Sequence, residues 1–342
     1  MTKIVPMVMC GGNGTRLWPR SRKAKPKPFL PLLGDSTLFK ATLARCADKA
    51  MFAPPLVVAG EAHIEHIRAQ LSDGGSVIVE PGARNTAPAI ALAAARQPED
   101  AMMLICSSDH HIQDTEAFRA AIVSAAKIAG EGQLVAIGIR PTAPETGFGY
   151  IQHGNEIAHG HKVKRFVEKP DLERAKAFLA EGDFSWNGGI FVFKAGAYMD
   201  ELRRFRPDIV SLVEQAVSEG REDGNLFYPA AEPFLKIEGD SIDYAVMEKT
   251  QKAATVTADM GWSDIGNWKA LYDEQEADHA GNLVRGDADL VDCENVYVDS
   301  DGPRVSAIGL KDVVIVVDGD DILVTTMDGA RKVGKLPGAE NQ

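Results

Sequence analysis

Residues 10–32 read Cys-Gly-Gly-Asn-Gly-Thr-Arg-Leu-Trp-Pro-Arg-Ser-Arg-Lys-Ala-Lys-Pro-Lys-Pro-Phe-Leu-Pro-Leu, and this stretch decides how the fold is interpreted. It follows an apolar run, 4–10, which has the length of a buried strand. Three glycines in its first five residues permit positive φ and let several backbone N–H donors approach an anion, while Arg16 adds a bidentate cation. More cations follow as far as Lys27, on a segment stiffened by prolines. The stretch therefore predicts a strand followed by a phosphate-binding loop.

Two well-known phosphate loops do not fit this pattern. A P-loop needs Gly, four residues and then Gly-Lys-Ser/Thr, and neither of the first two glycines is followed by a glycine five positions later. The dinucleotide pattern G-x-G-x-x-G fits Gly12 and Gly14 but requires a third glycine where Leu17 stands. A plain tight turn after a strand would explain the glycines, but not the cations on the stiffened segment.

Composition excludes several classes of protein. The chain has 342 residues, enough for one large and one small domain, and its 37 basic and 49 acidic residues give a net charge of −12, which argues against a nucleic-acid-binding surface. The four cysteines contain no Cys-x-x-Cys pair, so neither a zinc site nor a disulfide framework is indicated, and a reducing cytoplasm suits them. No signal peptide and no apolar run near ~20 residues is present, so no membrane association is expected.

The first 140 residues alternate between short apolar runs and helical segments. This alternation predicts an α/β domain with a parallel sheet covered by helices on both faces. Pro6 lies inside the first run and fits a central strand only near its start, where no ladder bond is lost. The best-supported helix begins after Asp114 and ends near Gly130. The expected strands are 4–10, 56–59, 77–79, 102–106 and 134–139.

The pattern of predicted secondary structure changes near residue 278. Between 147 and 258 strands and helices alternate less regularly, which is common where an α/β enzyme binds its second substrate. After 281 no helical period is visible, and evenly spaced turn residues separate short apolar runs. We therefore expect a catalytic domain over 1–278, a small all-β domain over 279–336 and a disordered tail over 337–342.

Several polar residues follow predicted strands, at the edge where open α/β sheets bind ligands. Asp109 comes directly after the run 102–106 and is suited to hold Mg²⁺ between phosphate oxygens. Arg84 and Asn85 precede an Ala-rich helix for which Thr86 is the expected N-cap, and they offer hydrogen bonds to a base or ribose. Each of these signals has an ordinary structural alternative, such as a helix start or a turn, so none is specific alone.

Two further segments add polar groups of the same kind. Glu168 and Lys169 close another strand and pair a hydroxyl-binding carboxylate with a phosphate-binding cation. Asn187 stands beside glycines that allow close backbone approach. Asp264 is the one carboxylate of a turn rich in glycine and aromatic residues, and the sequence alone does not bring it next to Asp109.

Taken in order, these motifs closely resemble those of the nucleotidyltransferases that make sugar nucleotides, and among them the mannose-1-phosphate guanylyltransferases. The resemblance covers essentially the whole chain. It implies a Rossmann-like, mixed but mostly parallel sheet of the nucleotide-diphospho-sugar transferase type with a small C-terminal all-β unit. The segments that carry it are 11–19, 26–32, 80–90, 109–110, 146–151, 168–170, 186–189, 241–248 and 262–268, continued by 292–324.

The resemblance also implies roles for individual residues. Catalysis would fall to Arg16 and Lys27, with Mg²⁺ held by Asp109 and Asp264. GTP and mannose 1-phosphate would be the substrates, and a homodimer is compatible with the resemblance. The residues expected to bind nucleotide are Gly11, Gly12, Asn13, Gly14, Thr15, Arg16, Arg84, Asn85 and Ser108. Those expected to bind the sugar phosphate are Gly147, Glu168, Lys169 and Asn187.

Three departures from the family pattern limit this transfer. Pro28 stands where glutamine is usual, directly after Lys27, and Phe148 stands where tyrosine is usual. Many bacterial relatives continue into a fused isomerase domain, whereas this sequence stops at Gln342, so no isomerase activity is expected. Two alternatives stay open: a pyrophosphorylase that uses UTP or dTTP with another hexose 1-phosphate, and a silent paralogue that binds GDP-mannose and regulates a partner.

Overall fold

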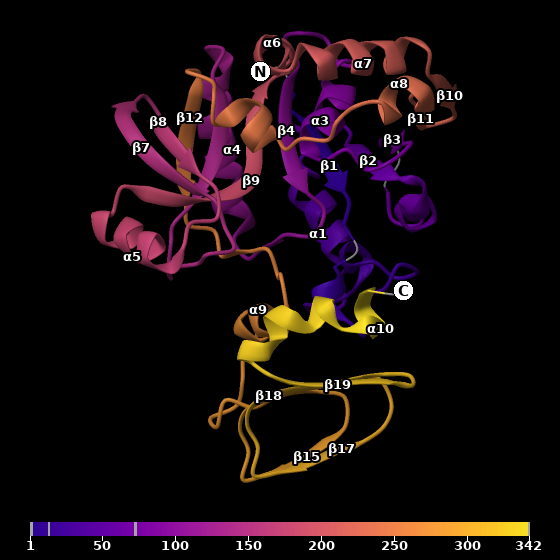
Figure 1. The fold of residues 1–342 in the computed structure, drawn as a ribbon, viewed down its shortest axis with the longest axis vertical. Helices are drawn as coiled ribbons and strands as arrows, with labels where there is room; N and C mark the ends of the chain where they lie inside the picture. The colour runs from indigo at the N-terminus through magenta and orange to yellow at the C-terminus, as the bar shows by residue number, and fades with distance from the viewer. Residues whose placement is uncertain (1–2, 13, 72–73, 341–342) are drawn as a thin grey trace. The chain divides into compact units, whose positions relative to one another are not determined.

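The computed structural model describes residues 3–12, 14–71 and 74–340 (Figure 1). Tertiary contacts divide the chain into two compact units. The first comprises Met1–Cys10, Thr42–Ser108 and Ile112–Trp262, and the second comprises Gly11–Ala41, Asp109–His111 and Ser263–Gln342. By contacts, the glycine loop therefore packs with the C-terminal strands. The boundary expected at residue 278 was drawn along the sequence, and it stays a prediction.

The first unit is built on one mixed sheet. Within the described residues, eleven strands are ordered β10-β11-β3-β2-β1-β4-β9-β6-β12-β8-β7. The bounds are β1 Val5–Cys10, β2 Leu56–Gly60, β3 Ser76–Glu80, β4 Met102–Ser107, β6 Leu134–Ile139, β7 Tyr150–Ile157, β8 Gly160–Val167, β9 Phe184–Lys194, β10 Arg221–Asp223, β11 Leu226–Tyr228 and β12 Ala253–Ala258. The α/β class with a mixed sheet is confirmed.

The expectation of a mostly parallel sheet holds for only part of it. Strands β11, β3, β2, β1 and β4 run parallel to one another, as β12 does to β6. In contrast, β9 is antiparallel to β4, β6 and β7. At 11 residues β9 also includes the mostly polar and glycine residues 185–189, which no apolar run marks as a strand.

Pro6 is accommodated near the start of the central strand β1. The ladder of β1 with β4 begins at Val5, whereas the ladder with β2 begins only at Met7. A residue without an N–H group is tolerated there, since the ladder with β2 starts one residue later. The predicted strand is therefore confirmed together with its proline.

Two hydrophobic cores cover the two faces of this sheet. Successive side chains of a strand point to opposite faces, and in β4 Met103 and Ile105 belong to one core while Met102 and Leu104 belong to the other. The first core takes α3 (Thr86–Ala94), α6 (Ala195–Phe205), α7 (Pro207–Ser218) and α8 (Ala231–Leu235), and the second takes α4 (Thr115–Gly130) and α5 (Leu172–Glu181). In α4 the predicted cap Asp114 accepts the Ala117 N–H at 2.9 Å. The remaining helical segments of this unit are α2 Ile64–Arg68, η3 Glu61–His63 and η4 Asp243–Met247.

The strands in the C-terminal part of the second unit, residues 283–326, pair mostly in parallel, and we call them the strand coil. Strand β16 pairs in parallel with β14 and β18, β15 pairs in parallel with β17, and β19 closes the sheet antiparallel to β18. The pairings of β16 with β18 and of β15 with β17 join residues 17 positions apart, such as Glu294 with Lys311. The predicted C-terminal strands are confirmed, but the range 279–336 also contains the 3-10 helix Asp328–Lys335, so it is not all-β. The bounds are β14 Leu283–Arg285, β15 Ala288–Val291, β16 Glu294–Ser300, β17 Val305–Ile308, β18 Lys311–Asp318 and β19 Asp321–Thr326.

A shared core joins these strands to the glycine-loop segment within the second unit. It combines side chains from both ends of the chain, including Leu17, Trp268, Tyr297 and Val316. The Trp268 indole N–H donates to the Trp18 carbonyl at 2.8 Å. The helical elements here are η1 Thr15–Leu17, η2 Lys27–Phe29, α1 Leu38–Arg45 at the boundary between the units, α9 Trp268–Asp273 and η5 Asp328–Lys335.

The tail differs from the expectation of disorder. Pro337–Glu340 form a short helix, α10, in which Ala339 is buried in the core of the second unit. The small residues Gly338 and Ala339 allow this close packing, which a reading of composition does not reveal. Residues 341–342 lie outside the described residues. None of the helices that the structure describes has the length and apolar character needed to span a membrane.

Candidate functional site

Neighbouring strands lead into the two segments that the sequence singled out. Strands β1 and β4 are parallel, with Met9 opposite Ser107, so the glycine loop and Asp109 both begin just beyond the carboxyl ends of adjacent strands. Between them the Ser108 N–H donates to the Met9 carbonyl at 2.9 Å. The Ser108 hydroxyl is buried and has no hydrogen-bond partner in the described part of the chain.

Lys27 contacts both residues that were predicted to hold a metal. Its ammonium donates to Asp109 Oδ2 at 2.7 Å and also to the backbone carbonyl of Asp264. Only 8% of the Lys27 side chain is exposed, so the ammonium depends on these oxygens in place of water. The Asp264 carboxylate turns back on its own loop, where Oδ1 accepts the Gly266 N–H at 3.0 Å. The structure thus brings together the three residues that the sequence could not place relative to one another.

The glycine loop closes onto this lysine through Gly14. Gly14 has a φ of 62°, and a Cβ added there would lie 2.6 Å from Lys27 Cβ and 2.8 Å from Ser21 Oγ. Only glycine fits both the backbone conformation and the space. Arg16 is exposed and makes no ion pair in the described part of the chain, so its guanidinium is available to an anion. Of the other predicted loop residues, Gly11 and Gly12 are exposed, Thr15 is half-buried, and Asn13 lies outside the described residues.

A second polar cluster lies in the first unit. Lys169 Nζ contacts Glu168 Oε1 at 2.8 Å, and this hydrogen bond is the largest contribution that raises the pKa of Lys169. Gly149 leaves room for the Glu168 side chain, since a Cβ at residue 149 would lie 2.8 Å from Glu168 Oε2 and 3.4 Å from Asn187 Cβ. The predicted sugar-phosphate residues Glu168, Lys169 and Asn187 are therefore neighbours. Gly147 is exposed two residues earlier in the same loop.

Arg84 and Asn85 are engaged by their own loop. The Arg84 guanidinium donates to the carbonyls of Ala83 and Leu235, at 2.9 and 2.6 Å. Asn85, with a φ of 67°, is the N-cap of α3 and accepts the Thr86 N–H at 2.8 Å. The expectation of Thr86 as N-cap was wrong: asparagine tolerates positive φ and caps well, whereas the Thr86 hydroxyl accepts the Ile242 N–H at 2.9 Å.

Two half-buried acidic residues were not singled out in the sequence. Asp243 Oδ1 accepts a hydrogen bond from Asn187 Nδ2 at 2.8 Å, and burial, with the nearby Glu168, raises the pKa of Asp243 to about 6. Burial likewise raises the pKa of Glu80, at the end of β3, to about 7, and in the described residues its Oε1 has no hydrogen-bond partner. Both residues lie in segments that carry the resemblance. Their types and positions were visible in the sequence, but their burial was not.

Comparison with known proteins assigns the family. Residues 5–281 match the family model described as nucleotidyl transferase. The chain belongs to the nucleotidyl transferase family. The nucleotidyl transferase is 44% identical to a xanthan biosynthesis protein XanB of Xanthomonas campestris, over 98% of this chain and 73% of that protein. It is 42% identical to a mannose-1-phosphate guanylyltransferase of Klebsiella pneumoniae, over 97% of this chain and 73% of that protein. The resemblance noted in the sequence is thereby confirmed.

A solved structure is similar over the full length of the nucleotidyl transferase. It comes from Thermus thermophilus and is described as a mannose-1-phosphate geranyltransferase. The identity is 34% and the TM-score 0.90, with 99% of this chain and all of that chain covered. This similarity extends past residue 281, where the family match ends, so it includes the C-terminal strands.

The predicted metal ligands Asp109 and Asp264 offer carboxylate oxygens, the donor type that divalent ions such as Mg²⁺ take. The Lys27 ammonium contacts the Asp109 carboxylate and the Asp264 backbone carbonyl. Among the described residues no group of three or more metal-ligating side chains occurs. Mg²⁺ commonly takes one or two carboxylates and completes its shell with water and phosphate oxygens, whereas zinc sites in proteins usually use three or four side chains.

The structure predicts that Gly14→Ala destabilises the second unit. The left-handed backbone alone costs an alanine roughly 1–2 kcal/mol, and the overlap with Lys27 Cβ adds to that cost. The matched control is Gly34→Ala, since Gly34 has a φ of 68° but nothing within 4 Å of the added Cβ. Denaturant unfolding should show a clearly larger loss of stability for Gly14→Ala. Equal losses for the two variants would contradict the close packing of the loop on Lys27.

A second prediction concerns the pH dependence of stability. Because the pKa of Asp243 is raised to about 6 on folding, the folded state holds a proton that the unfolded state has lost between about pH 4 and 6, and stability falls as pH rises through that window. Asp243→Asn retains an acceptor for Asn187 and has no charge to bury. We expect it to gain about 1–2 kcal/mol relative to the parent between pH 4.5 and 7.5. A stability difference that is the same at both pH values would contradict the buried charge.

Proposed function

We propose that this protein transfers GMP from GTP to mannose 1-phosphate, which gives GDP-mannose and pyrophosphate. The observation that carries the proposal is the convergence of Lys27, Asp109 and Asp264 beside the glycine loop, in a chain that is 42% identical to mannose-1-phosphate guanylyltransferases over nearly its whole length. The reaction joins two polyanions. It therefore needs groups that neutralise and orient phosphate more than it needs an acid or a base.

The triphosphate is proposed to bind to the second unit. Exposed backbone N–H groups of the loop from Gly11 to Arg16 and the exposed Arg16 guanidinium suit the phosphate oxygens. Lys27 would contact the phosphates at the reacting centre, where its low exposure strengthens the interaction. The sugar phosphate attacks the α-phosphorus in line, and pyrophosphate leaves. The nucleophile is already an anion, so positioning and charge stabilisation account for most of the catalysis.

Asp109 and Asp264 are proposed to hold Mg²⁺. Nucleotidyltransferases generally use a divalent metal, and Lys27 lies against the Asp109 carboxylate and the backbone carbonyl of Asp264. When bound, the ion would neutralise charge on the phosphates as they react. Lys27 holds Asp109 in place, so the same lysine both contacts phosphate and orients a metal ligand.

Mannose 1-phosphate is proposed to bind to the cluster of the first unit. Glu168 and Asn187 are placed to bond sugar hydroxyls, and the exposed ammonium of Lys169 suits the phosphate. Gly147 would allow the sugar to approach the backbone. Asp243 fixes the Asn187 amide, and its carboxylate is a further acceptor for a hydroxyl group.

Guanine and ribose are proposed to bind to the loop that begins at Glu80, together with Ser108. The support is the set of buried polar atoms there that have no partner within the described residues, namely Glu80 Oε1, Arg84 Nε and Ser108 Oγ. Buried polar atoms are normally hydrogen-bonded, so atoms of this kind suit a polar ligand. The cytoplasmic location and the homodimer stay predictions.

The first test of this function is pyrophosphate release. The parent protein should release pyrophosphate from GTP and mannose 1-phosphate in the presence of Mg²⁺, and GDP-mannose should form in equal amount. No release with Mg²⁺ present would favour the silent, regulatory paralogue. UTP with glucose 1-phosphate is the matched comparison, and an equal or faster rate with that pair would overturn the assignment to GTP and mannose.

The metal assignment makes a separate prediction. Asp109→Asn and Asp264→Asn should each lower kcat by about 10²-fold or more, because each removes a charged ligand of the ion. Circular dichroism should remain that of the parent, since asparagine preserves the shape. Near-normal kcat in Asp264→Asn at saturating Mg²⁺ would rule out the shared metal. Asp273→Asn, which changes an exposed aspartate of the same unit paired with Lys269, is the control.

A further inference from the structure

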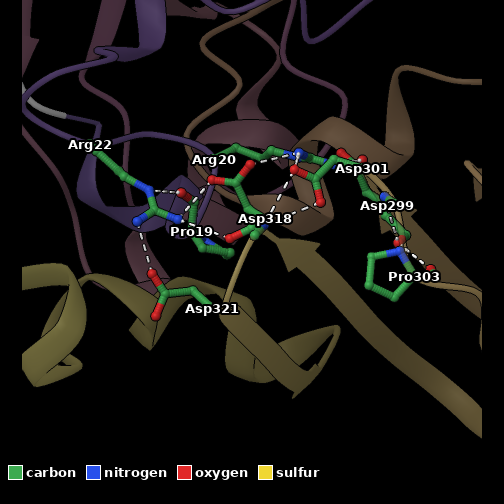
Figure 2. Close-up of polar contacts among 11 residues, drawn as sticks. Pro19, Arg20, Arg22, Asp299, Asp301, Pro303, Asp318 and Asp321 are labelled. Carbon is green, nitrogen blue, oxygen red and sulfur yellow. Dashed lines mark hydrogen bonds and ion pairs between the residues drawn. The ribbon is translucent and has the colours of Figure 1, made fainter.

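Two arginines follow the glycine loop and form ion pairs with the C-terminal strands of the same unit (Figure 2). Arg20 and Arg22 flank Ser21, on the segment that leads to Lys27. Their partners are carboxylates as far as 299 residues away along the chain. We call these carboxylates the aspartate cluster, which consists of Asp299, Asp301, Asp318 and Asp321.

Asp318 is the centre of this arrangement because it binds both arginines. Its Oδ1 accepts from Arg20 at 2.7 Å and its Oδ2 from Arg22 at 2.8 Å. The Asp318 backbone carbonyl accepts from Arg22 as well, at 3.2 Å. Asp318 ends β18, so the two guanidinium groups meet at one end of the strand coil.

The deepest contact is that between Arg20 and Asp299. The two side chains are 2.6 Å apart, and only 1% of the Asp299 side chain is exposed. A buried carboxylate needs a cation beside it, because an unpaired buried charge is strongly destabilising. Loss of the contact with Arg20 would leave Asp299 in that unfavourable state. Arg22 completes the set: it contacts Asp321 at 2.8 Å and donates from Nε to the Pro19 carbonyl at 2.8 Å.

The segment held by the two arginines packs directly against Gly14 of the glycine loop and is continuous with Lys27. Ser21, between the two arginines, lies where a Cβ on Gly14 would come within 2.8 Å of its hydroxyl oxygen, and the same Cβ would be 2.6 Å from Lys27 Cβ. A backbone pair between Arg22 and Lys25, at 2.9 and 3.1 Å, then turns the chain toward Lys27. A shift of the anchored segment would therefore move the loop and the lysine together.

The anchor itself lies outside the part of the chain that defines the family. The family match covers residues 5–281, and the aspartate cluster begins at Asp299. The catalytic lysine is thus held in part by the C-terminal strands, beyond the matched domain.

We propose that Arg20 and Arg22, clamped by the aspartate cluster, are positioning residues that fix Lys27 and the glycine loop for phosphate binding. The C-terminal strands then affect the reaction without contacting substrate. The proposal rests on the proposed function for its kinetic consequence, whereas its structural consequence can be measured separately.

The structural test uses hydrogen–deuterium exchange on the full chain without ligands. Asp318→Asn removes the charge at the centre of the cluster, and we expect amides between residues 14 and 32 to exchange about tenfold faster. The helix α9 in the same unit reports on general destabilisation, and its exchange should stay unchanged. The matched control is Asp287→Asn, which breaks the exposed pair with Arg304 at 2.8 Å in the same strand coil. Faster exchange in both variants, or in neither, would overturn the proposal, as would faster exchange in α9 to the same degree.

The kinetic test separates positioning from simple loss of stability. Asp318→Asn and Arg22→Gln should lower kcat by about 10- to 100-fold, with each KM changed far less, because misplacement by an ångström can cost about 10²-fold. Arg304→Gln should keep the parent kcat, and Arg22→Lys should recover part of the loss. In the Lys27→Met background, Asp318→Asn should add little, since it acts through that lysine. The proposal would be overturned if Asp318→Asn lowered kcat by the same factor in the Lys27→Met background as in the parent. A kcat loss explained by the unfolded fraction alone would also overturn it. A parent without turnover would refute the proposed function and leave the exchange result standing.

Discussion

The buried ammonium of Lys27 is the constraint on which the phosphate-binding part of the structure depends. An ammonium largely removed from water must keep an anionic partner, and breaking such a buried pair typically costs about 3–5 kcal/mol. Asp109 and the Asp264 carbonyl supply that partner from two other segments of the chain. These three segments must therefore fold as one unit. Gly14 belongs to the same constraint, because any side chain there would displace the lysine.

This constraint explains why the units found by contacts cut across the order of the sequence. Segments 11–41, 109–111 and 263–342 are far apart along the chain, yet Lys27 of the first contacts Asp109 of the second and the Asp264 carbonyl of the third. Surface ion pairs contribute about 0–1 kcal/mol each, too little to gather such segments. The pair of Arg20 with Asp299 differs because it is buried, and the shared core around Trp268 and Tyr297 adds apolar contact. Burial, more than the number of charges, holds this unit together.

The sequence predicted the elements of the fold better than their pairing. Apolar runs located β1 and β4 within a residue or two, because buried strands are continuously apolar. The antiparallel course of β9 could not be predicted, since it depends on which neighbours the strand meets. The small β unit was expected, but its parallel coil is a matter of register over 17 residues that no local pattern encodes.

For the candidate site, the position of Asp109 after a strand and that of Lys27 on the proline-stiffened segment were visible in the sequence, and their roles stay predictions. The burial of other polar residues was not visible there. Asp243 and Glu80 are ordinary acidic residues in the sequence, and only enclosure raises their pKa values to about 6 and about 7. A carboxylate kept at such a cost lowers stability at neutral pH, so a folded chain would be more stable without it. Sites that bind polar ligands are where such costs are found, because the ligand supplies the missing partner. The Arg20 pair differs in that a cation already faces its carboxylates, although Asp299 Oδ2 has no hydrogen-bond partner among the described residues.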